Sequence, residues 1–257
     1  LDDAEVKRKM FREVFYEVLS ALVKELNCSY LVQGTIAPDW IETLGGIKTQ
    51  HNVLTTEYTT KRGFKVIEPL RDLYKDQVRQ VAKYLGIPDE IVQRQPFPGP
   101  GLLIRTVGRF TRDKLEVVRK ATEIVENYLS RYMPSQYFAA IWDYDVIEKG
   151  RLCNNICLDY EVFNVKATGV KGDVRAYENI ILVKKYEGLD IYEIYKYFED
   201  LNCSHTIILL GDKGYGNYFI SIRSVETKDF MTADVSRLPI NELAELSNEL
   251  LKHDKVR

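Results

Sequence analysis

The chain has 257 residues, with 45% hydrophobic and 29% charged side chains and a formal net charge of −2. This length accommodates one large domain or two ordinary ones, and the composition is typical of a globular protein. The nearly balanced charge excludes a chain that is drawn as a whole to nucleic acid or to a membrane surface. Because no apolar run approaches roughly 18 residues, a membrane span is excluded as well.

The chain contains four cysteines, which are too few and too scattered for a disulfide framework in a chain of this length. We therefore expect reduced thiols and a cytoplasmic location. An alternative is a metal site built from Cys153, Cys157, Cys203 and His205, although this spacing fits no standard zinc pattern. The chain starts at Leu1 without a methionine, which predicts a fragment or a processed chain.

The first part of the chain predicts the order helix, strand, loop, strand, helix. Apolar side chains from Val6 to Leu26 lie on one helical stripe, and charged residues occupy the opposite face. The second helix is expected to end at Gly86, with Pro88 just beyond it. This order is typical of an α/β sheet that binds ligands in the loops at the carboxyl ends of its strands. The predicted segments are helices at 5–27 and 74–88, strands at 28–36 and 64–70, and a long loop at 41–64.

The second part predicts an α+β arrangement. Its first helix covers 111–133 and has Thr111 as its N-cap. Strands are predicted at 136–142, 179–185, 205–211 and 218–225, and amphipathic helices at 190–201 and 239–252. The boundary near Pro96 gives two domains, 1–95 and 96–257.

The segment "PFPGPG", residues 96–101, separates the two parts. Proline fixes φ and removes a backbone donor, whereas glycine lets a backbone pass close to another group. Their alternation predicts a stiff segment that is neither helix nor strand. It is either a rigid linker or a backbone surface shaped for a ligand at a domain junction, and both interpretations are compatible.

A polar cluster follows the first predicted strand, in "QGTIAPDWIE" and "GGIKTQHN". Asp39 and Glu42 are three residues apart, so a helical turn places both carboxylates on one side, where they can hold Mg²⁺ together with phosphates. Lys48 and His51 lie in a glycine-hinged loop that can close over a ligand and supply a cation and a proton-transfer group. A solvated polar surface loop is the alternative interpretation.

Two further clusters carry groups suited to anions. Lys75 and Asp76 begin the second helix, where backbone N–H groups favour phosphate, but ordinary helix-start chemistry explains them equally well. In "ATGVKGDVRAY", Asp173 and Arg175 accompany two glycines in a turn that suits a phosphate or a planar polar ring. The alternative is a surface turn with a local salt bridge.

Taken together, these motifs resemble GMP synthase. They are "VQGTIAPDWIE", "GGIKTQHNV", "EPLRDLYKDQVR", "RQPFPGPGLLIRTVG", "KATGVKGDVRAY" and "RSVETKDFMTADVSRLP", and they occur in the order expected of that family. The match is to its ATP-pyrophosphatase and dimerisation part, in the form of the separate archaeal-type synthetase subunit. The resemblance implies a partial parallel sheet like that of adenine-nucleotide hydrolases, followed by an α+β dimerisation domain.

The resemblance implies an amination in two steps. ATP adenylylates O2 of XMP and releases pyrophosphate, and ammonia then attacks C2 and expels AMP to give GMP. ATP and Mg²⁺ are the implied cofactors, with Mg²⁺ bridged by the ATP phosphates rather than held in a protein metal site. A glutamine amidotransferase subunit is the implied source of ammonia, and a homodimer is the implied assembly. Neither nucleic acid nor a membrane is an expected partner.

The resemblance also implies roles for individual residues. The loop at 45–52 matches the family's mobile lid, in which Lys48 and His51 assist adenylylation. Gln50 stands where the family usually has the first of two adjacent histidines, which concentrates any proton transfer on His51. Asp39 and Glu42 match the acidic positions before the lid, and Lys75 and Asp76 match a pair near the ATP phosphates. The residues implied in XMP binding are Gly34, Thr35, Gln136, Asp173, Arg175 and Arg223. A hinge or wall of the nucleotide site is implied at Pro98, Gly99, Pro100 and Gly101.

The sequence departs from the family pattern in three places. The phosphate-binding loop of the form Ser-Gly-Gly-x-Asp-Ser is expected upstream of Leu1, and the ending similar to "KPPATIE" is expected beyond Arg257, so we expect a chain truncated at both ends. Extra stretches near 142–164 and 178–217 also interrupt the pattern. They separate the motifs from which the roles of Gln136 and Arg223 are assigned. They are expected to decorate a dimer interface or to bind a regulator, with an unordered loop as the alternative.

Two competing functions stay open on the sequence. One is a non-catalytic subunit for XMP binding or assembly, because the phosphate-binding loop is absent. The other is a different ATP pyrophosphatase, such as an NAD synthetase or a tRNA-thiolating enzyme. The motifs "PFPGPGL" and "GVKGDVRAY" argue against the latter, and the net charge does not support a tRNA enzyme.

Overall fold

A computed structural model describes residues 1–44, 63–96, 100–153, 156–171, 174–184, 186, 188–211, 214–227 and 233–257. The chain divides into two compact units. We call Glu5–Pro96 the N-terminal unit, and Leu1–Ala4 together with Phe97–Arg257 the C-terminal unit. In the part of the chain that is described, no helix combines the length and the apolar character that crossing a membrane requires.

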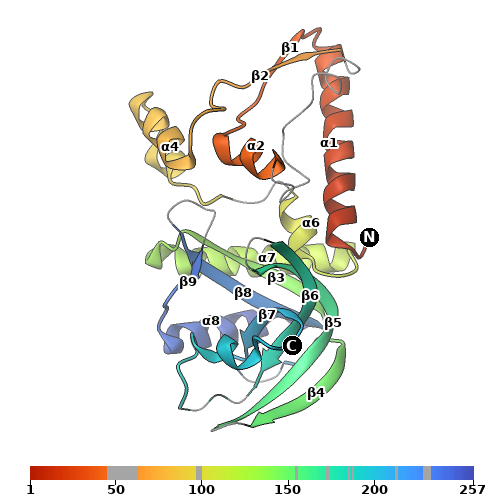
Figure 1. Ribbon diagram of the computed structural model, residues 1–257, viewed down its shortest axis with the longest axis vertical. Helices are drawn as coiled ribbons and strands as arrows, with labels where there is room; N and C mark the ends of the chain where they lie inside the picture. The colour runs from red at the N-terminus through yellow and green to blue at the C-terminus, as the bar shows by residue number, and fades with distance from the viewer. Residues whose placement is uncertain are drawn as a thin grey trace. The chain divides into compact units, whose positions relative to one another are not determined.

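The N-terminal unit contains two short parallel strands and several helices (Figure 1). Strands β1 (Tyr30–Val32) and β2 (Lys65–Ile67) pair in parallel, with Leu31 opposite Val66. The helices are α1 (Ala4–Glu25), α2 (Ala37–Leu44), α4 (Lys75–Tyr84) and α5 (Asp89–Val92). The predicted helices and strands of this region are confirmed, whereas the loop predicted at 41–64 is wrong at its start, because α2 continues to Leu44. Gly86, which follows α4, has a left-handed φ of 75°.

The apolar stripe of α1 is largely exposed. Val14, Val18 and Leu22 are 52%, 56% and 46% exposed, whereas Lys7 and Arg8 near the start of the same helix are buried. The periodicity therefore predicts the helix correctly. The apolar stripe of an amphipathic helix usually packs on a core, but among the described residues little covers this one.

The C-terminal unit is built on two sheets (Figure 1). The first has the order β3-β8-β9 and the second the order β4-β5-β6-β7, in which only the β6–β7 pair is parallel. The strands are β3 (Gln136–Asp143), β4 (Val146–Cys153), β5 (Cys157–Lys171), β6 (Val174–Val183), β7 (Cys203–Ile208), β8 (Tyr218–Glu226) and β9 (Asp234–Val235). The helices are α6 (Gly101–Arg105), α7 (Arg112–Leu129), η1 (Ser130–Tyr132), η2 (Ile194–Phe198) and α8 (Ile240–Leu251). A parallel pair in one unit, and one antiparallel and one mixed sheet with helices in the other, confirm the expected fold class.

Alternation along the strands explains how these layers stack. On β3, Ala139 and Ile141 pack with helices α7 and α8, whereas Trp142 packs with Phe163 of the second sheet. On β6, Ile180 and Leu182 face this same layer between the sheets, and Ile181 and Val183 face η2. The side chains of β6 are thus buried on both faces of the sheet, which explains why its sequence is continuously apolar rather than alternating.

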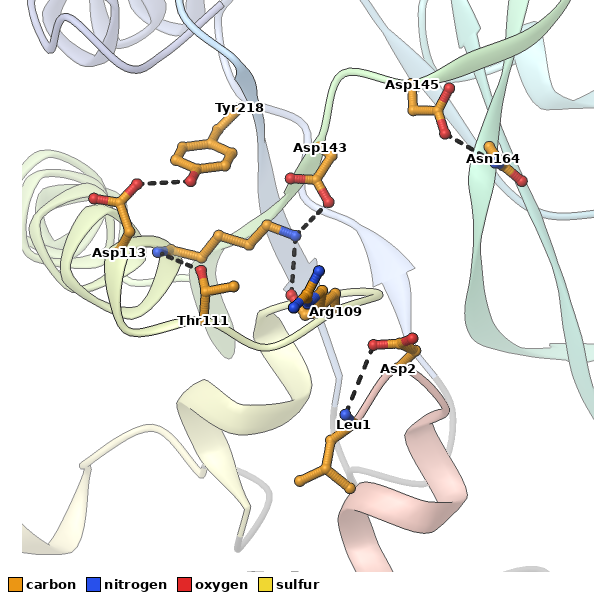
Figure 2. Close-up of polar contacts among 10 residues, drawn as sticks. Leu1, Asp2, Arg109, Thr111, Asp113, Asp143, Asp145, Asn164 and Tyr218 are labelled. Carbon is orange, nitrogen blue, oxygen red and sulfur yellow. Dashed lines mark hydrogen bonds and ion pairs between the residues drawn. The ribbon is translucent and has the colours of Figure 1, made fainter.

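The start of α7 is fixed by polar contacts (Figure 2). The backbone N–H of Lys114 donates to Thr111 Oγ1 at 3.2 Å, which confirms the predicted N-cap. The Lys114 ammonium is buried and donates to Asp143 Oδ2 at 2.6 Å and to the Arg109 carbonyl at 2.9 Å. A lysine is therefore tolerated inside the unit because its charge is paired and hydrogen-bonded.

Two predictions for the extra stretches are corrected. The segment expected as an amphipathic α-helix at 190–201 forms turns and the short 3-10 helix η2, whose Ile194 and Phe198 are buried. Cys153 and Cys157 form a disulfide at the end of the β4–β5 hairpin, so the expectation of reduced thiols is wrong for this pair. The disulfide also removes both sulfur atoms from the alternative metal site. Cys28 and Cys203 are free thiols.

Candidate functional site

The carboxyl end of β1 carries the first polar group of the candidate site. Gln33 directly follows the strand, and its backbone N–H donates to the Ile67 carbonyl at 2.9 Å, which extends the β1–β2 pairing. Its side-chain amide donates to the Tyr16 hydroxyl of α1 at 3.1 Å. Since both groups are buried, these two bonds fix where the chain turns away from the sheet.

Gly34 and Thr35 form this turn. Thr35 is buried, and its hydroxyl donates to Glu68 Oε1 at 2.7 Å, which joins the ends of the two strands. Gly34 is exposed, and a Cβ placed on it would meet nothing within 4 Å. The protein's own packing therefore does not require glycine here, whereas a ligand that approaches the backbone would benefit from it.

Helix α2 begins two residues later and positions Asp39. The Ile36 backbone N–H donates to Asp39 Oδ2 at 3.0 Å, so the carboxylate is held at the helix N-terminus. The Trp40 indole donates to the Arg71 carbonyl at 3.0 Å, and the Arg71 guanidinium lies 5.4 Å from the centre of the Trp40 ring. These contacts tie α2 to the segment that leads from β2 into α4.

Lys75 begins α4 and lies near Asp39. Burial and the positive charge of Arg79 lower the pKa of Lys75, while the negative charge of Asp39 opposes this shift. The Tyr74 backbone N–H donates to Gln77 Oε1 at 2.8 Å, which fixes the start of the helix. A half-buried ammonium beside a carboxylate, at the carboxyl edge of parallel strands, is suited to phosphate groups.

The other residues predicted for this region are only partly placed. Asp76 is exposed next to Lys75. Glu42 lies in α2, three residues after Asp39. The two backbone positions are therefore on the same side of the helix, as predicted. Lys48 and His51 lie outside the described residues.

The C-terminal unit brings two predicted XMP residues onto one sheet face. Gln136 pairs with Val225, and Phe138 pairs with Arg223, across the antiparallel β3–β8 ladder. Opposite residues share a face, and so do residues two apart, so Gln136 and Arg223 point to the same side. The Arg105 guanidinium lies 5.2 Å from the centre of the Phe138 ring. The extra stretches therefore do not separate Gln136 from Arg223.

One neighbour of this cluster was missed by sequence reasoning. Burial and the positive charge of Arg223 lower the pKa of His205 to about 4. The sequence treated His205 only as a possible metal ligand, because nothing in it shows that β7 lies beside β6. Among the described residues, no group of three or more His, Cys, Asp or Glu side chains is arranged to hold a metal ion.

The remaining predictions lie at the edges of the described structure. Arg175 is in β6, next to the tight β5–β6 turn in which Lys171 pairs with Val174, and Asp173 lies outside the described residues. Pro98 and Gly99 also lie outside them. Pro100 is buried and is the N-cap of α6, and Gly101 has a left-handed φ of 41°. Since Gly101 is the first residue of α6, the prediction that the proline segment contains no helix is wrong at its last residue.

Comparison with known families gives matches in both halves of the chain. A family model described as GMP synthase C terminal domain matches residues 185–255, and a model described as NAD synthase matches residues 47–102.

Comparison with curated proteins gives matches over nearly the whole chain. A glutamine-hydrolyzing GMP synthase B-subunit from Sulfurisphaera tokodaii is 52% identical over 257 aligned residues, which cover 97% of this chain and 69% of that protein. The B-subunit from Saccharolobus solfataricus is 49% identical over 98% of this chain and 68% of its own length. The B-subunit from Archaeoglobus fulgidus is 48% identical over 73% of this chain and 54% of its own length.

Proposed function

Since the chain belongs to the family of GMP synthase B-subunits, we propose that it carries out the ATP-dependent amination of XMP to GMP. The observation that best supports this activity is the Lys75 ammonium beside Asp39, at the carboxyl edge of β1 and β2, next to the open backbone of Gly34. The relatives are named as synthases, which does not favour a non-catalytic assembly subunit.

The proposed reaction has two balanced steps. The O2 atom of XMP attacks the α-phosphorus of ATP, the bond to the β-phosphate oxygen breaks, and pyrophosphate leaves. Ammonia then adds at C2, the C2–O2 bond breaks, AMP leaves with the oxygen, and the added nitrogen loses protons to become the amino group of GMP. Both steps require positive groups near the departing phosphates.

In the N-terminal unit, Lys75 stabilises the negative charge that develops on the pyrophosphate. The Gly34–Thr35 turn offers its backbone to a nucleotide, because Gly34 has open space in front of it. Glu68 holds Thr35 in place through the hydroxyl bond. Lys48 and His51 keep their proposed roles in the lid, and Asp76 its place near the ATP phosphates.

We propose that Mg²⁺ is held mainly by the phosphates of ATP. Mg²⁺ commonly takes one or two carboxylates together with phosphate oxygens, and Asp39 and Glu42 are the carboxylates proposed for it. A bound Mg²⁺ neutralises charge on the phosphates of ATP.

In the C-terminal unit, Gln136, Arg223, Asp173 and Arg175 are the residues proposed to bind XMP. The shared face of Gln136 and Arg223 supports the first two assignments. A guanidinium suits the substrate phosphate, and a side-chain amide suits the polar edge of a purine.

We also propose the partners that follow from this activity. A glutamine amidotransferase subunit supplies the ammonia, as the name of the relatives implies for them, and the protein is a homodimer. We place it in the cytoplasm, where its nucleotide substrates are made. Sedimentation of the protein alone, and of its mixture with the amidotransferase, tests both associations.

The decisive test is an assay of the protein expressed from its complete gene. With ATP, Mg²⁺, XMP and ammonium chloride, we expect equal amounts of GMP, AMP and pyrophosphate, and no product when XMP or ATP is left out. Lys75→Met should abolish most of this activity, while Lys83→Met in the last turn of the same helix should retain it. Failure of the unmodified protein to consume XMP contradicts the proposed function.

A further inference from the structure

His205 lies on the inner face of the second sheet, where it is directed toward the first sheet. In the parallel β6–β7 pair His205 is opposite Ile180, and Ile180 belongs to the hydrophobic layer between the two sheets. Ile207, two residues further along β7, packs in the same layer. Because side chains alternate along a strand, His205 faces this layer too.

Arg223 faces the same layer from the opposite sheet. Its strand neighbour Phe219 packs in that layer, and residues four apart on a strand share a face. Burial and the positive charge of Arg223 both lower the pKa of His205, so the guanidinium lies within electrostatic range of the imidazole. The two residues therefore face the same layer, His205 from β7 and Arg223 from β8.

The charge of Arg223 is not neutralised by a carboxylate in the described structure. No hydrogen bond or ion pair of its guanidinium is found among the described residues. Part of the side chain is open to solvent, while burial of the guanidinium lowers the pKa of Arg223. The other charged groups on this face are Arg105, over the Phe138 ring, and Glu178 on β6. Glu178 does not counter the shift at His205, whose pKa responds to burial and to Arg223.

Ser204 fixes the orientation of the His205 ring. The Ser204 hydroxyl donates to the Glu178 carbonyl at 2.9 Å, so its single proton is used there. The contact of 3.1 Å between Ser204 Oγ and His205 Nδ1 is therefore one in which Nδ1–H donates. The neutral ring consequently presents Nε2 as an acceptor, which becomes a second donor when the ring is protonated.

Strand β7 also contacts β5 at Gly169. A Cβ added to Gly169 in β5 would lie 2.9 Å from the Ser204 carbonyl oxygen, so glycine is required at this crossing. The extra stretch at 178–217 thus brings His205 to the layer that Arg223 faces, and it brings Ser204 against Gly169 of β5.

We propose that His205 and Arg223 together form an anion site that holds the phosphate monoester of the nucleotide substrate. This inference rests on the proposed function for the identity of the nucleotide. A phosphate dianion supplies the negative charge that Arg223 lacks, and it also favours the protonated imidazole. Binding is then accompanied by uptake of a proton at His205, which becomes a charged donor to the phosphate.

Imidazole proton NMR tests the proton uptake directly. The chain has three histidines, and the His205 signal is the one that disappears in His205→Gln. Without anion we expect this signal not to titrate above about pH 6, because its pKa is about 4. With inorganic phosphate its pKa should rise by at least about one unit. A His205 signal that phosphate leaves unchanged overturns the proposal.

Calorimetry then identifies the part of the substrate that is recognised. His205→Gln should weaken XMP binding about tenfold and leave binding of xanthosine, which lacks the phosphate, unchanged. Equal weakening for both ligands overturns the phosphate assignment, and so does unchanged XMP binding. If phosphate shifts the His205 signal but the protein makes no GMP, the anion site stands and the proposed function fails.

Matched variants separate this role from a structural one. Thr206→Ala changes the neighbouring residue on the opposite face of β7, and His253→Gln removes another histidine; both should bind XMP normally. His205→Asn keeps a donor to Ser204, so it should fold even if His205→Gln does not. It should still lose the proton uptake that accompanies XMP binding, and an uptake equal to that of the unmodified protein contradicts the proposal.

Discussion

The two units differ in how they are stabilised. The C-terminal unit has three clusters of buried hydrophobic residues, stacked on both faces of its two sheets. In the N-terminal unit, α1 exposes most of its apolar stripe, and apolar residues of the two short strands, such as Tyr30, Val32 and Ile67, are also exposed. Within the described residues, the N-terminal unit is held together to a larger extent by individual hydrogen bonds.

This difference affects how each candidate site is held. Thr35, Asp39 and Lys75 are placed by turns and helix starts, which are fixed by bonds such as the one from Thr35 to Glu68. Gln136, Arg223 and His205 are placed by strands whose other residues lie in a packed core. Changes in the N-terminal unit are therefore expected to affect chemistry more than global stability, and the reverse is expected for core changes in the C-terminal unit.

Asp39→Asn is expected to have the largest effect on activity. The amide keeps an oxygen for the Ile36 N–H but loses the charge that faces Lys75, so the rate of GMP formation should fall about 100-fold or more. Stability should change by less than about 1 kcal/mol, because the cap geometry is retained. The measurements are kcat for GMP formation and urea unfolding. Asp89→Asn at the start of α5 is the control, and equal rates for both variants would contradict the role of Asp39.

Leu246→Ala should have the largest effect on stability. Leu246 is fully buried in the cluster between α7, α8 and the first sheet, so its truncation should cost about 2–5 kcal/mol of unfolding free energy. Leu22→Ala in α1 makes the same chemical change at a side chain that is 46% exposed, and it should cost less than about 1 kcal/mol. Urea unfolding of both variants gives the comparison. A large loss for Leu22→Ala would show that the α1 stripe is covered in solution.

Much of the fold was predictable because it depends on local sequence. Periodicity predicted α1, α7 and α8, side-chain chemistry predicted the Thr111 cap, and short apolar runs predicted β1, β2, β3 and β8. The 3-10 helix at Ile194–Phe198 was expected as an α-helix, since its apolar spacing fits either form. The β4–β5 hairpin and its disulfide depend on the pairing of two segments, which periodicity does not report.

The candidate site was predictable only where its residues lie close together in the sequence. The Gln33–Glu42 cluster is local, and its turn and helix follow from its residues. The electrostatic effect of Asp39 on Lys75 depends on how α2 and α4 are arranged, which no spacing in the sequence reports. His205 was missed as a neighbour of Arg223, because that relation requires the register of β7 on β6 and the stacking of two sheets.

The Lys114–Asp143 pair allows a smaller test of the C-terminal unit (Figure 2). The Lys114 side chain is 2% exposed and that of Asp143 is 54% exposed. Asp143→Asn leaves a buried ammonium without its counter-charge and should cost about 1–3 kcal/mol, whereas Lys114→Met leaves a carboxylate that water can solvate and should cost less. Urea unfolding midpoints decide the order, and a larger loss for Lys114→Met would contradict this explanation.

The smallest expected effect is a pH dependence from Glu161, which is buried in β5. Burial alone would raise the pKa of Glu161, but hydrogen bonds from the Lys184 ammonium and the Tyr144 hydroxyl outweigh it and lower the pKa below its usual 4.5. The folded state therefore favours the carboxylate. Its contribution to stability is complete above the unfolded pKa near 4.5 and is lost as the pH falls through the lower folded value.

Glu161→Gln should remove this part of the acid sensitivity. The variant is expected to be less stable than the unmodified protein near neutral pH, because the amide is a weaker partner for Lys184. The gap should narrow as the pH falls from about 6 to about 3, since the unmodified protein then loses the same interaction. Glu148→Gln, at an exposed position of β4, is the control and should change the free energy of unfolding only slightly at neutral pH. If the difference in unfolding free energy between Glu161→Gln and the unmodified protein stays constant down to about pH 3, the charge of Glu161 does not stabilise the folded state.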